Sequence, residues 1–397
     1  MRNCGECPED AGSSTDGRRF LRELVRRLAV DLHFTPGSDD FFLVKIALQF
    51  VGFGNVARRF VQLLDETRPT LTALGIEPVV VGITTRRHGG VFEAAGLDAI
   101  RAARIIAEGG VLSSTPAPST DAWAAQLRSR STEARVVFET TTLDVRSGEP
   151  AIQHVRAAFT AGAHVVTANK GPVAFAYRAL AEEARAAGVS FLFEGAVMDG
   201  LPVFNLVRET MPGVTIRGFR GVVNSTTNHI LTALEAGEGF APALERMQAD
   251  GVAEADASLD VDGWDAAAKA AALANVWLDA DLTPLHVRRE GINEDTGERA
   301  RAVRAAGRRL KLVAYAYGRG DQVKAAVELE ELAPDDPLAV LDGQGNALEI
   351  DTWPLGRIVI TQRDGGLEKT AYALLSDLIT IGKQLGAGSK DPASIRS

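Results

Sequence analysis

An apolar segment that leads straight into a glycine-rich turn and a helical pattern constrains the fold of this chain more than any other feature. Residues 43–51 are almost all apolar, and the sequence GFGNVA (52–57) follows them directly. G-x-G-x-x-A between a strand and a helix is typical of a dinucleotide-binding turn. Gly52 permits the tight turn, Gly54 lets the backbone approach a pyrophosphate, and Ala57 allows the helix to pack closely on the strand.

Strand and helix patterns alternate after this turn. Apolar runs predict strands at residues 78–84, 135–138, 164–167 and 190–194, and helical periodicity predicts helices at 56–64, 97–108, 152–161 and 177–187. This alternation is typical of a parallel, doubly wound sheet. After residue 200 the pattern changes to strands at 217–223, 323–329 and 357–361 and helices at 228–235, 265–278 and 371–385.

We therefore expect an α/β protein with a Rossmann-type doubly wound parallel sheet and a second, α+β domain for catalysis and dimerisation. The expected divisions are a partly disordered N-terminal extension (1–40), a dinucleotide-binding domain (41–175), the α+β domain (176–355) and a C-terminal segment that returns to the cofactor domain (356–397). A basic amphipathic pattern at residues 20–30 predicts a short helix within the extension.

Composition and charge narrow the range of partners. The chain has 397 residues, 46% hydrophobic and 24% charged, with a formal net charge of −9, which favours neither nucleic acid nor an anionic membrane. We expect a cytoplasmic protein, because no transmembrane-length apolar run and no secretory signal is evident. Cys4 and Cys7 form a C-x-x-C in a polar tail, but the sequence offers no second ligand pair for zinc.

An acidic segment that runs into an apolar helix carries the strongest chemical signal. Residues 253–274 read AEADASLDVDGWDAAAKAAALA, and Asp265 and Lys269 lie four residues apart, on one helix face. The helix is apolar on every side, which predicts burial, and a buried charged pair must be well partnered. A solvated ion pair is the alternative. A buried lysine beside carboxylates is a candidate proton donor, and the carboxylates can hold a cationic substrate group.

The second predicted strand indicates the choice of cofactor. NAD-binding proteins usually place an acidic residue where this strand ends, but the sequence there is Thr84-Thr85-Arg86-Arg87. Arginines suit the 2′-phosphate of NADP, so NADP is favoured over NAD. The alternative is that Arg86 and Arg87 are solvated loop charges.

Two further motifs have both functional and structural interpretations. VVTANKGP (165–172) places Lys170 at the carboxyl end of a strand, where ligands bind in open α/β sheets, although a surface lysine is equally compatible with this position. GVVNSTTNHIL (221–231) places polar residues before a helix. Helix capping explains them better than an anion site does.

Taken together, these motifs and EGAVMDGLP (194–202) resemble the homoserine dehydrogenase family from about residue 42 to 385. The resemblance implies reversible NAD(P)H-dependent reduction of L-aspartate 4-semialdehyde to L-homoserine, in threonine, methionine and isoleucine biosynthesis. It also implies a homodimer. Two alternatives are a related NADP-dependent dehydrogenase of another amino-acid aldehyde and a non-catalytic dinucleotide-binding sensor. We expect no regulatory ACT domain.

The resemblance also implies roles for individual residues. Lys269 corresponds to the proton donor, and Lys170 to a second lysine close to substrate and nicotinamide. The substrate amino group would be held by Glu254, Asp260 and Asp265. Cofactor contacts are expected from Gly52, Phe53, Gly54, Asn55, Val56, Arg86, Arg87, Thr141, Lys170 and Gly366. Backbone carbonyls of a monovalent cation site, usually sodium, are expected at Glu194, Val197, Asp199 and Leu201. Met198 and Asp199 depart from the small residues usual in that loop, and Ala257 from the usual proline.

Overall fold

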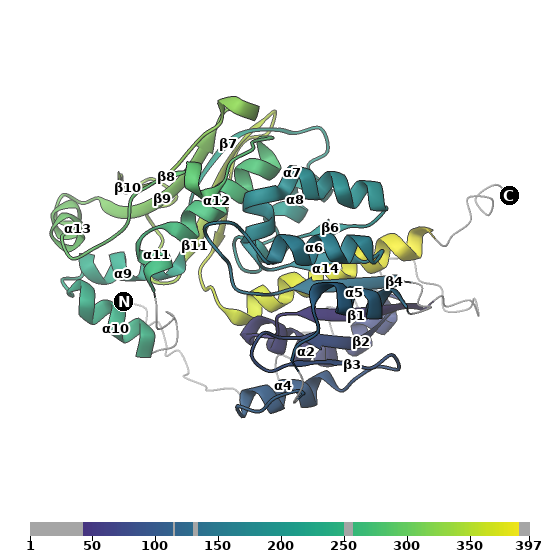
Figure 1. The fold of residues 1–397 in the computed structure, drawn as a ribbon. Coiled ribbons are helices and arrows are strands. Elements are labelled where there is room, and N and C mark those ends of the chain that lie inside the picture. Colours follow the sequence, from purple (N-terminus) through teal and green to yellow (C-terminus); the bar gives the residue numbers. More distant parts are fainter. Residues whose placement is uncertain (1–42, 114–115, 130–133, 250–256, 389–397) are drawn as a thin grey trace, which may run out of the picture.

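The computed structural model describes residues 43–113, 116–129, 134–249 and 257–388 of the chain. The predicted helix at 20–30, the Cys4 and Cys7 pair and the acidic residue Glu254 lie outside these ranges. Figure 1 shows the two sheets, each with its own helices, and the last helix, α14, lying along the first sheet.

Six strands form the first sheet in the order β3-β2-β1-β4-β5-β6. Their bounds are β1 (Val44–Val51), β2 (Ile76–Thr84), β3 (Gly90–Phe92), β4 (Ala134–Glu139), β5 (His164–Thr167) and β6 (Phe191–Leu192). All neighbours pair in parallel except β2 and β3. The apolar runs that predicted these strands are buried because helices cover both faces of the sheet.

Four helices of this part lie where the sequence predicts them, whereas two further helices, near residues 70 and 124, were not predicted. In chain order the helices are α2 (Asn55–Glu66), α3 (Arg68–Ala73), α4 (Ala99–Ala107), α5 (Thr120–Arg128), α6 (Ala151–Thr160) and α7 (Lys170–Ala187). Side chains of α2, α4 and α14 share a core with one face of β1, which includes Ile46 and Phe50. Side chains of α5, α6 and α7 share a second core with the opposite face, which includes Val51.

The second sheet is largely antiparallel and has the order β12-β11-β7-β9-β10-β8. Its strands are β7 (Thr215–Val222), β8 (Arg288–Arg289), β9 (Arg309–Tyr317), β10 (Lys324–Leu332), β11 (Asn346–Trp353) and β12 (Gly356–Gln362). The helices are α8 (Val203–Thr210), α9 (Ser225–Glu235), α10 (Phe240–Ala249), α11 (Ser258–Val261), α12 (Trp264–Trp277), α13 (Thr296–Ala305) and α14 (Leu367–Gly388), with short 3₁₀ turns η1 (Glu194–Ala196), η2 (Pro284–His286) and η3 (Gly320–Gln322). A Rossmann-type sheet with a second α+β part is thus confirmed.

Helix α14 connects the two parts of the molecule. It follows β12 of the second sheet, yet Ala371, Leu374 and Leu378 are buried in the core of the first sheet. In Figure 1 it is the yellow helix beside the purple and blue strands. Arg59 of α2 forms an ion pair with Glu368 in the first turn of α14. Helix α14 therefore packs on the first sheet although it follows the second.

The sheets set limits that differ from the divisions expected from the sequence. Residue 175 falls inside α7, and β6 at residues 191–192 still belongs to the first sheet. Strand β12 belongs to the second sheet, so the returning segment begins after residue 362. Among the helices in the described ranges, none combines the length and the apolar character needed to cross a membrane.

Candidate active site

The glycine-rich turn forms an open cradle at the carboxyl edge of the first sheet. Gly52 has φ +85°, and a Cβ at this position would lie 2.7 Å from the carbonyl carbon and oxygen of Thr140. Gly54 precedes α2 without a side-chain hydrogen bond to cap the helix, and a Cβ on Gly54 would meet nothing within 4 Å in the part of the chain described. Free backbone N–H groups at a helix start attract phosphate. These residues therefore fit a dinucleotide.

The loop after β2 is a closed turn that presents two arginines. The Thr85 hydroxyl donates to the Gly89 carbonyl oxygen at 2.9 Å and accepts from the His88 backbone N–H at 2.8 Å. Arg86 and Arg87 lie exposed at the tip of this turn. No acidic side chain lies between the end of β2 and β3, as the sequence indicated.

The two candidate lysines meet at one carboxylate. Asp265 lies in the first turn of α12, and its Oδ2 is 3.0 Å from Nζ of Lys269, one turn further along. Its Oδ1 is 3.0 Å from Nζ of Lys170, the first residue of α7. The lysine and aspartate side chains are only 13–20% exposed. The pair of Asp265 and Lys269 is therefore part of a largely buried cluster and not a fully solvated ion pair.

Asn224 completes this cluster, although its sequence pattern favoured helix capping over an anion site. Its Oδ1 accepts from the Thr227 backbone N–H at 2.8 Å, so the capping role at α9 is confirmed. Its Nδ2 donates to Asp260 Oδ1 at 2.7 Å and to Asp265 Oδ2 at 2.9 Å. One amide group therefore holds two carboxylates together. No local signal reveals this second role, because the partners come from residues 36 and 41 positions away.

Burial and neighbouring charges set the protonation states of the cluster. Burial disfavours the charged form of Asp265, but the ammonium groups of Lys170 and Lys269 outweigh it and lower the pKa of this carboxyl. Burial also disfavours the charged form of Lys269, yet Asp265, followed by Asp199 and Asp260, raises the pKa of its ammonium. Burial, with the charge of Asp265, raises the pKa of Asp260. Lys269 is thus held as an ammonium that can donate a proton.

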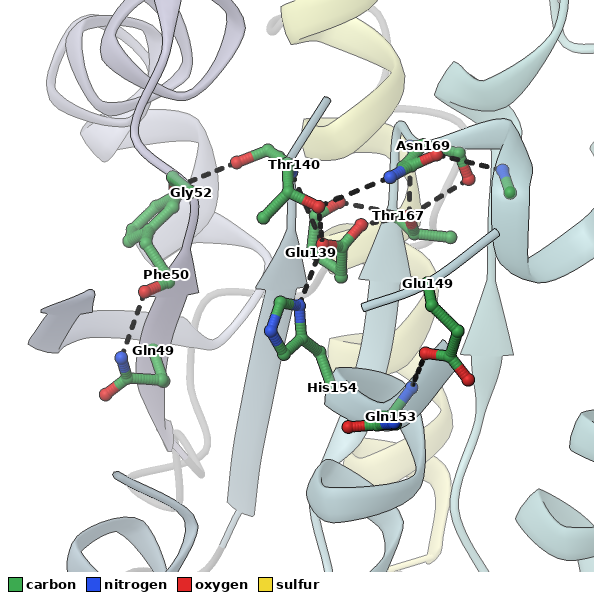
Figure 2. A network of polar contacts seen from close by, with 12 residues as sticks. Gln49, Phe50, Gly52, Glu139, Thr140, Glu149, Gln153, His154, Thr167 and Asn169 are labelled. Atoms are coloured by element: carbon green, nitrogen blue, oxygen red, sulfur yellow. Dashed lines mark hydrogen bonds and ion pairs between the residues drawn. The ribbon is translucent and has the colours of Figure 1, made fainter. Parts of the chain in front are cut away.

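The expected cofactor threonine and the loop before α7 belong to one hydrogen-bonded network, drawn in Figure 2. Thr141 follows β4, and its hydroxyl donates to the Glu139 carboxylate. The Asn169 amide donates to the Thr141 hydroxyl at 3.3 Å. The Thr140 hydroxyl donates to the Gly52 carbonyl oxygen at 2.9 Å, which ties this edge to the glycine-rich turn.

The residues expected to bind a cation lie on one loop beside the start of α14. The buried Glu194 carboxylate accepts backbone N–H bonds from Phe204 at 2.9 Å and Asn205 at 2.7 Å. Asp199 has φ 52°, and its carboxylate accepts from the backbone N–H of Gly366 at 3.2 Å. The carbonyl oxygen of Leu201 accepts from the Val203 N–H at 2.8 Å. Val197 is buried after the 3₁₀ turn η1.

A dinucleotide cradle beside a buried lysine–carboxylate cluster defines a nicotinamide-dependent oxidoreductase. Family models match two consecutive stretches of the chain: "homoserine dehydrogenase, NAD binding domain" over residues 52–194 and "homoserine dehydrogenase" over residues 202–379. The chain belongs to the homoserine dehydrogenase family.

Relatives and solved structures agree with this assignment. The chain is 38% identical over 341 residues to an NAD(+)-dependent homoserine dehydrogenase of Pseudomonas canavaninivorans, covering 85% of this chain and 97% of the relative. It is 34% identical over 335 residues to a homoserine dehydrogenase of Sulfurisphaera tokodaii, covering 84% and 98%. A homoserine dehydrogenase structure from Thiobacillus denitrificans matches with a TM-score of 0.73 and 27% identity, covering 87% of this chain and 75% of that one. A hyperthermophilic archaeal homoserine dehydrogenase in complex with NADPH matches with a TM-score of 0.71 and 27% identity, covering 86% and 98%.

Proposed function

We propose that the cluster of Lys170, Asp265 and Lys269 is the catalytic centre at which this enzyme interconverts L-aspartate 4-semialdehyde and L-homoserine. The convergence of both lysines on Asp265, at 3.0 Å each, is the observation that carries this proposal. In the reductive direction the carbonyl carbon gains a hydride and the carbonyl oxygen gains a proton. A bound reduced nicotinamide supplies the hydride.

Lys269 is the proposed proton donor to the carbonyl oxygen. The carboxylates around it keep the ammonium charged before substrate arrives. The substrate carries its own ammonium group, which would pair with Asp260, Asp265 and Glu254, although Glu254 lies outside the described residues. That pairing offsets the negative charge beside Lys269 and so eases release of its proton to the oxygen. In the oxidative direction Lys269, once deprotonated, accepts the proton of the homoserine hydroxyl.

Substitution of Lys269 by alanine tests this role. We expect Lys269→Ala to lower kcat for homoserine oxidation by roughly 10²- to 10⁴-fold, as for loss of a general acid or base. The Kd for NADPH, measured by fluorescence titration, should stay within error. Lys383→Ala, at an exposed lysine near the end of α14, serves as the matched control. Wild-type turnover in Lys269→Ala would refute the assignment.

We further propose that NADP is the preferred cofactor. The exposed pair Arg86 and Arg87, on a turn closed by Thr85, supports this choice, because charge-assisted hydrogen bonds to a 2′-phosphate are strong. The relatives differ here: one is named as NAD(+)-dependent and one solved structure contains NADPH. The remaining proposed contacts come from Phe53, Asn55 and Val56 at the start of α2, from Thr141 after β4, and from Gly366 before α14.

The arginine pair is tested by replacing both residues. We expect Arg86→Ala with Arg87→Ala to raise the KM for NADP by at least roughly tenfold, since each lost charged hydrogen bond costs about 1.5 kcal/mol or more. The KM for NAD should hardly move. Raising the salt concentration should shrink the difference between wild type and variant, because salt screens exposed charges. Equal effects on both cofactors, or a wild-type preference for NAD, would contradict the proposal.

A monovalent cation such as sodium is proposed at the loop of Glu194, Val197, Asp199 and Leu201. Backbone carbonyl oxygens are hard donors that suit such an ion. A fully buried carboxylate oxygen next to this loop, Asp377 Oδ1, has no hydrogen-bond partner in the part of the chain described, which fits a nearby positive charge. Dependence of the thermal midpoint on NaCl but not on tetramethylammonium chloride would support the site.

We also propose a homodimer that forms through the open face of the second sheet. Tyr317 is 52% and Val359 40% exposed on this face. Charged side chains such as Arg217, Glu330 and Arg357 line a shallow depression around Tyr317. Apolar and aromatic side chains among mixed charges are common in protein interfaces.

The proposed location is the cytoplasm and the proposed pathway is homoserine-derived amino-acid biosynthesis.

A further inference from the structure

A buried carboxylate at the carboxyl end of β4 has no part in the proton transfer described above. Glu139 is 0% exposed, as the last residue of its strand. Its Oε1 accepts from the Thr141 hydroxyl, from the Thr141 backbone N–H at 3.3 Å and from His154 Nδ1 at 3.3 Å. Its Oε2 lies 3.4 Å from the Thr167 hydroxyl. Figure 2 shows two of these partners beside Glu139: His154, which comes from α6, and Thr167, which ends β5.

Burying a carboxylate is costly unless donors surround it. Within the described part of the chain, His154 is the titratable group in contact with this carboxylate, and its side chain is 12% exposed. An apolar side chain at the end of this strand would cost less free energy to bury than the carboxyl group of Glu139 does. Its neighbours indicate what the acceptor contributes.

A carboxylate fixes the direction of each hydrogen bond that follows it. The Thr141 hydroxyl has a single proton, and it gives this proton to the Glu139 carboxyl oxygen Oε1. The oxygen lone pairs of Thr141 then face the Asn169 amide, which donates at 3.3 Å. The amide of Asn169 is thereby oriented with its oxygen toward the Gly171 backbone N–H, 2.9 Å away. That last contact caps the start of α7.

The capped turn carries Lys170. Asn169 is the N-cap residue of α7 and is only 4% exposed, and Lys170 is the first residue of the helix. Lys170 then reaches across to Asp265 of the second part of the molecule, at 3.0 Å. A continuous series of contacts therefore runs from Glu139 through Thr141 and Asn169 to the lysine–carboxylate cluster.

We propose that Glu139 is a positioning residue, which acts through Thr141 and Asn169 to hold both the nicotinamide-side threonine and Lys170 in their working geometry. The proposal rests on the cofactor and catalytic roles proposed above for Thr141 and Lys170. Small displacements of positioned groups reduce turnover strongly. Glu139 itself need touch neither substrate nor cofactor.

The experiment compares variants at two points of the network in the full-length enzyme. Glu139→Ala removes the acceptor, and Glu139→Gln keeps an oxygen that can accept from Thr141 and His154. Thr141→Val breaks the link to Asn169, and Thr141→Ser keeps it. His164→Ala, at the opposite end of β5 where His164 accepts from the Ser190 N–H at 3.0 Å, controls for general loosening of the sheet. Each variant is measured for kcat, for the Kd of NADPH and for thermal midpoint.

We expect Glu139→Ala and Thr141→Val each to lower kcat and weaken NADPH binding, with kcat roughly 10- to 100-fold below wild type. Glu139→Gln and Thr141→Ser should recover to within about threefold. The double variant should be no worse than the poorer single variant, because both changes break one series of contacts. His164→Ala should lose thermal stability without these losses.

Two results would overturn the proposal. One is a Glu139→Ala enzyme that loses only thermal stability, as His164→Ala does. The other is a double variant whose losses multiply, which would make the two residues independent. If Glu139→Ala does not fold, Thr141→Val against Thr141→Ser decides by the same measurements. Lys170→Ala, assayed in parallel, tests the proposed catalytic role separately: wild-type turnover there would refute that role, while the NADPH titrations would still report on Glu139.

Discussion

Several polar side chains in this protein each form hydrogen bonds or ion pairs with two or more partners. Asp265 pairs with two lysines through its two oxygens, and Asn224 caps α9 with one end of its amide and holds two carboxylates with the other. Such sharing satisfies several buried polar groups with few side chains, which lowers the cost of keeping charge in the interior. It also makes each of these residues difficult to replace by a group of similar size.

Lys311 is a buried lysine outside the proposed active site. Its side chain is 0% exposed, and its Nζ donates to Asn228 Oδ1 at 2.8 Å and to the carbonyl oxygen of Leu341. Burial, with a further contribution from Arg309, lowers the pKa of this ammonium to about 8 from 10.5. Between these pH values the unfolded chain binds more protons than the folded one. The lysine therefore makes the free energy of unfolding rise with pH from about 8 to 10.5.

Lys311→Met should remove this pH dependence. The difference in unfolding free energy between wild type and variant is expected to grow in favour of wild type as pH rises from 7.5 to 10, by roughly 1.4 kcal/mol for each pH unit at most. Urea unfolding followed by circular dichroism at a series of pH values measures it. A difference that stays constant over this range would show that the Lys311 ammonium is unperturbed.

At the scale of elements, the two glycines of the glycine-rich turn have different roles. Gly52 permits a strained turn, and Gly54 leaves space for a pyrophosphate. Gly52→Ala should destabilise the protein and abolish cofactor binding, because φ is +85° and the new Cβ would meet the Thr140 carbonyl. Gly54→Ala should leave the thermal midpoint within about 2 °C, since its Cβ meets nothing, but should still weaken NADPH binding by roughly tenfold or more where the backbone must approach a pyrophosphate. Differential scanning fluorimetry and NADPH titration distinguish the two. Unweakened binding in Gly54→Ala would place the pyrophosphate elsewhere.

The sequence predicts elements well where periodicity and turn residues agree. The strand at 164–167 and the first helix after GFGNVA are confirmed, as is the burial of the helix that carries Asp265 and Lys269. Strands β9 and β11 are missed, because Arg309–Tyr317 and Asn346–Trp353 interleave charged and apolar residues in the manner of a loop or helix. The predicted strand at 190–194 shortens to β6, since the chain turns into η1 at Glu194.

For the candidate site, the sequence predicts the residue types but not their assembly. The pair Asp265 and Lys269 is readable from its helical spacing. The contact of Lys170 with Asp265 is not, because it joins helices α7 and α12 from different parts of the chain. The roles of Glu139 and Asn224 are likewise set by partners from other strands and helices, so no local pattern indicates them.

At the scale of the whole molecule, the two sheets differ in what covers them. The first sheet has helices on both faces. In the second sheet, Leu338, Ala339 and Leu341 cover one end of the face that carries Tyr317 and Val359, and these two exposed side chains lie in its open part among paired charges. This open part is the location of the proposed dimer interface. The proposed active-site cluster, by contrast, lies where α7 of the first part meets α12 of the second.

Val359→Glu tests the proposed dimer. The wild-type protein should sediment at twice the chain mass of 42.2 kDa. Val359→Glu places a charge beside Glu349, its neighbour across β11 and β12, and should shift the particle toward the monomer. Val111→Glu, at a 56% exposed valine after α4, is the matched control and should leave the mass unchanged. A monomeric wild type, or a dimeric Val359→Glu, would rule out this face.

The position of α14 late in the chain has a consequence for folding during synthesis. The apolar side of β1 that includes Ile46 and Phe50 is made early in translation, but Ala371, Leu374 and Leu378, which cover it, are made near the end. Part of the core of the first sheet therefore stays exposed to water until the second sheet and α14 have been synthesised. Chaperone demand on the ribosome should be high for this chain, and a version truncated before α14 should aggregate instead of accumulating as a free cofactor-binding domain.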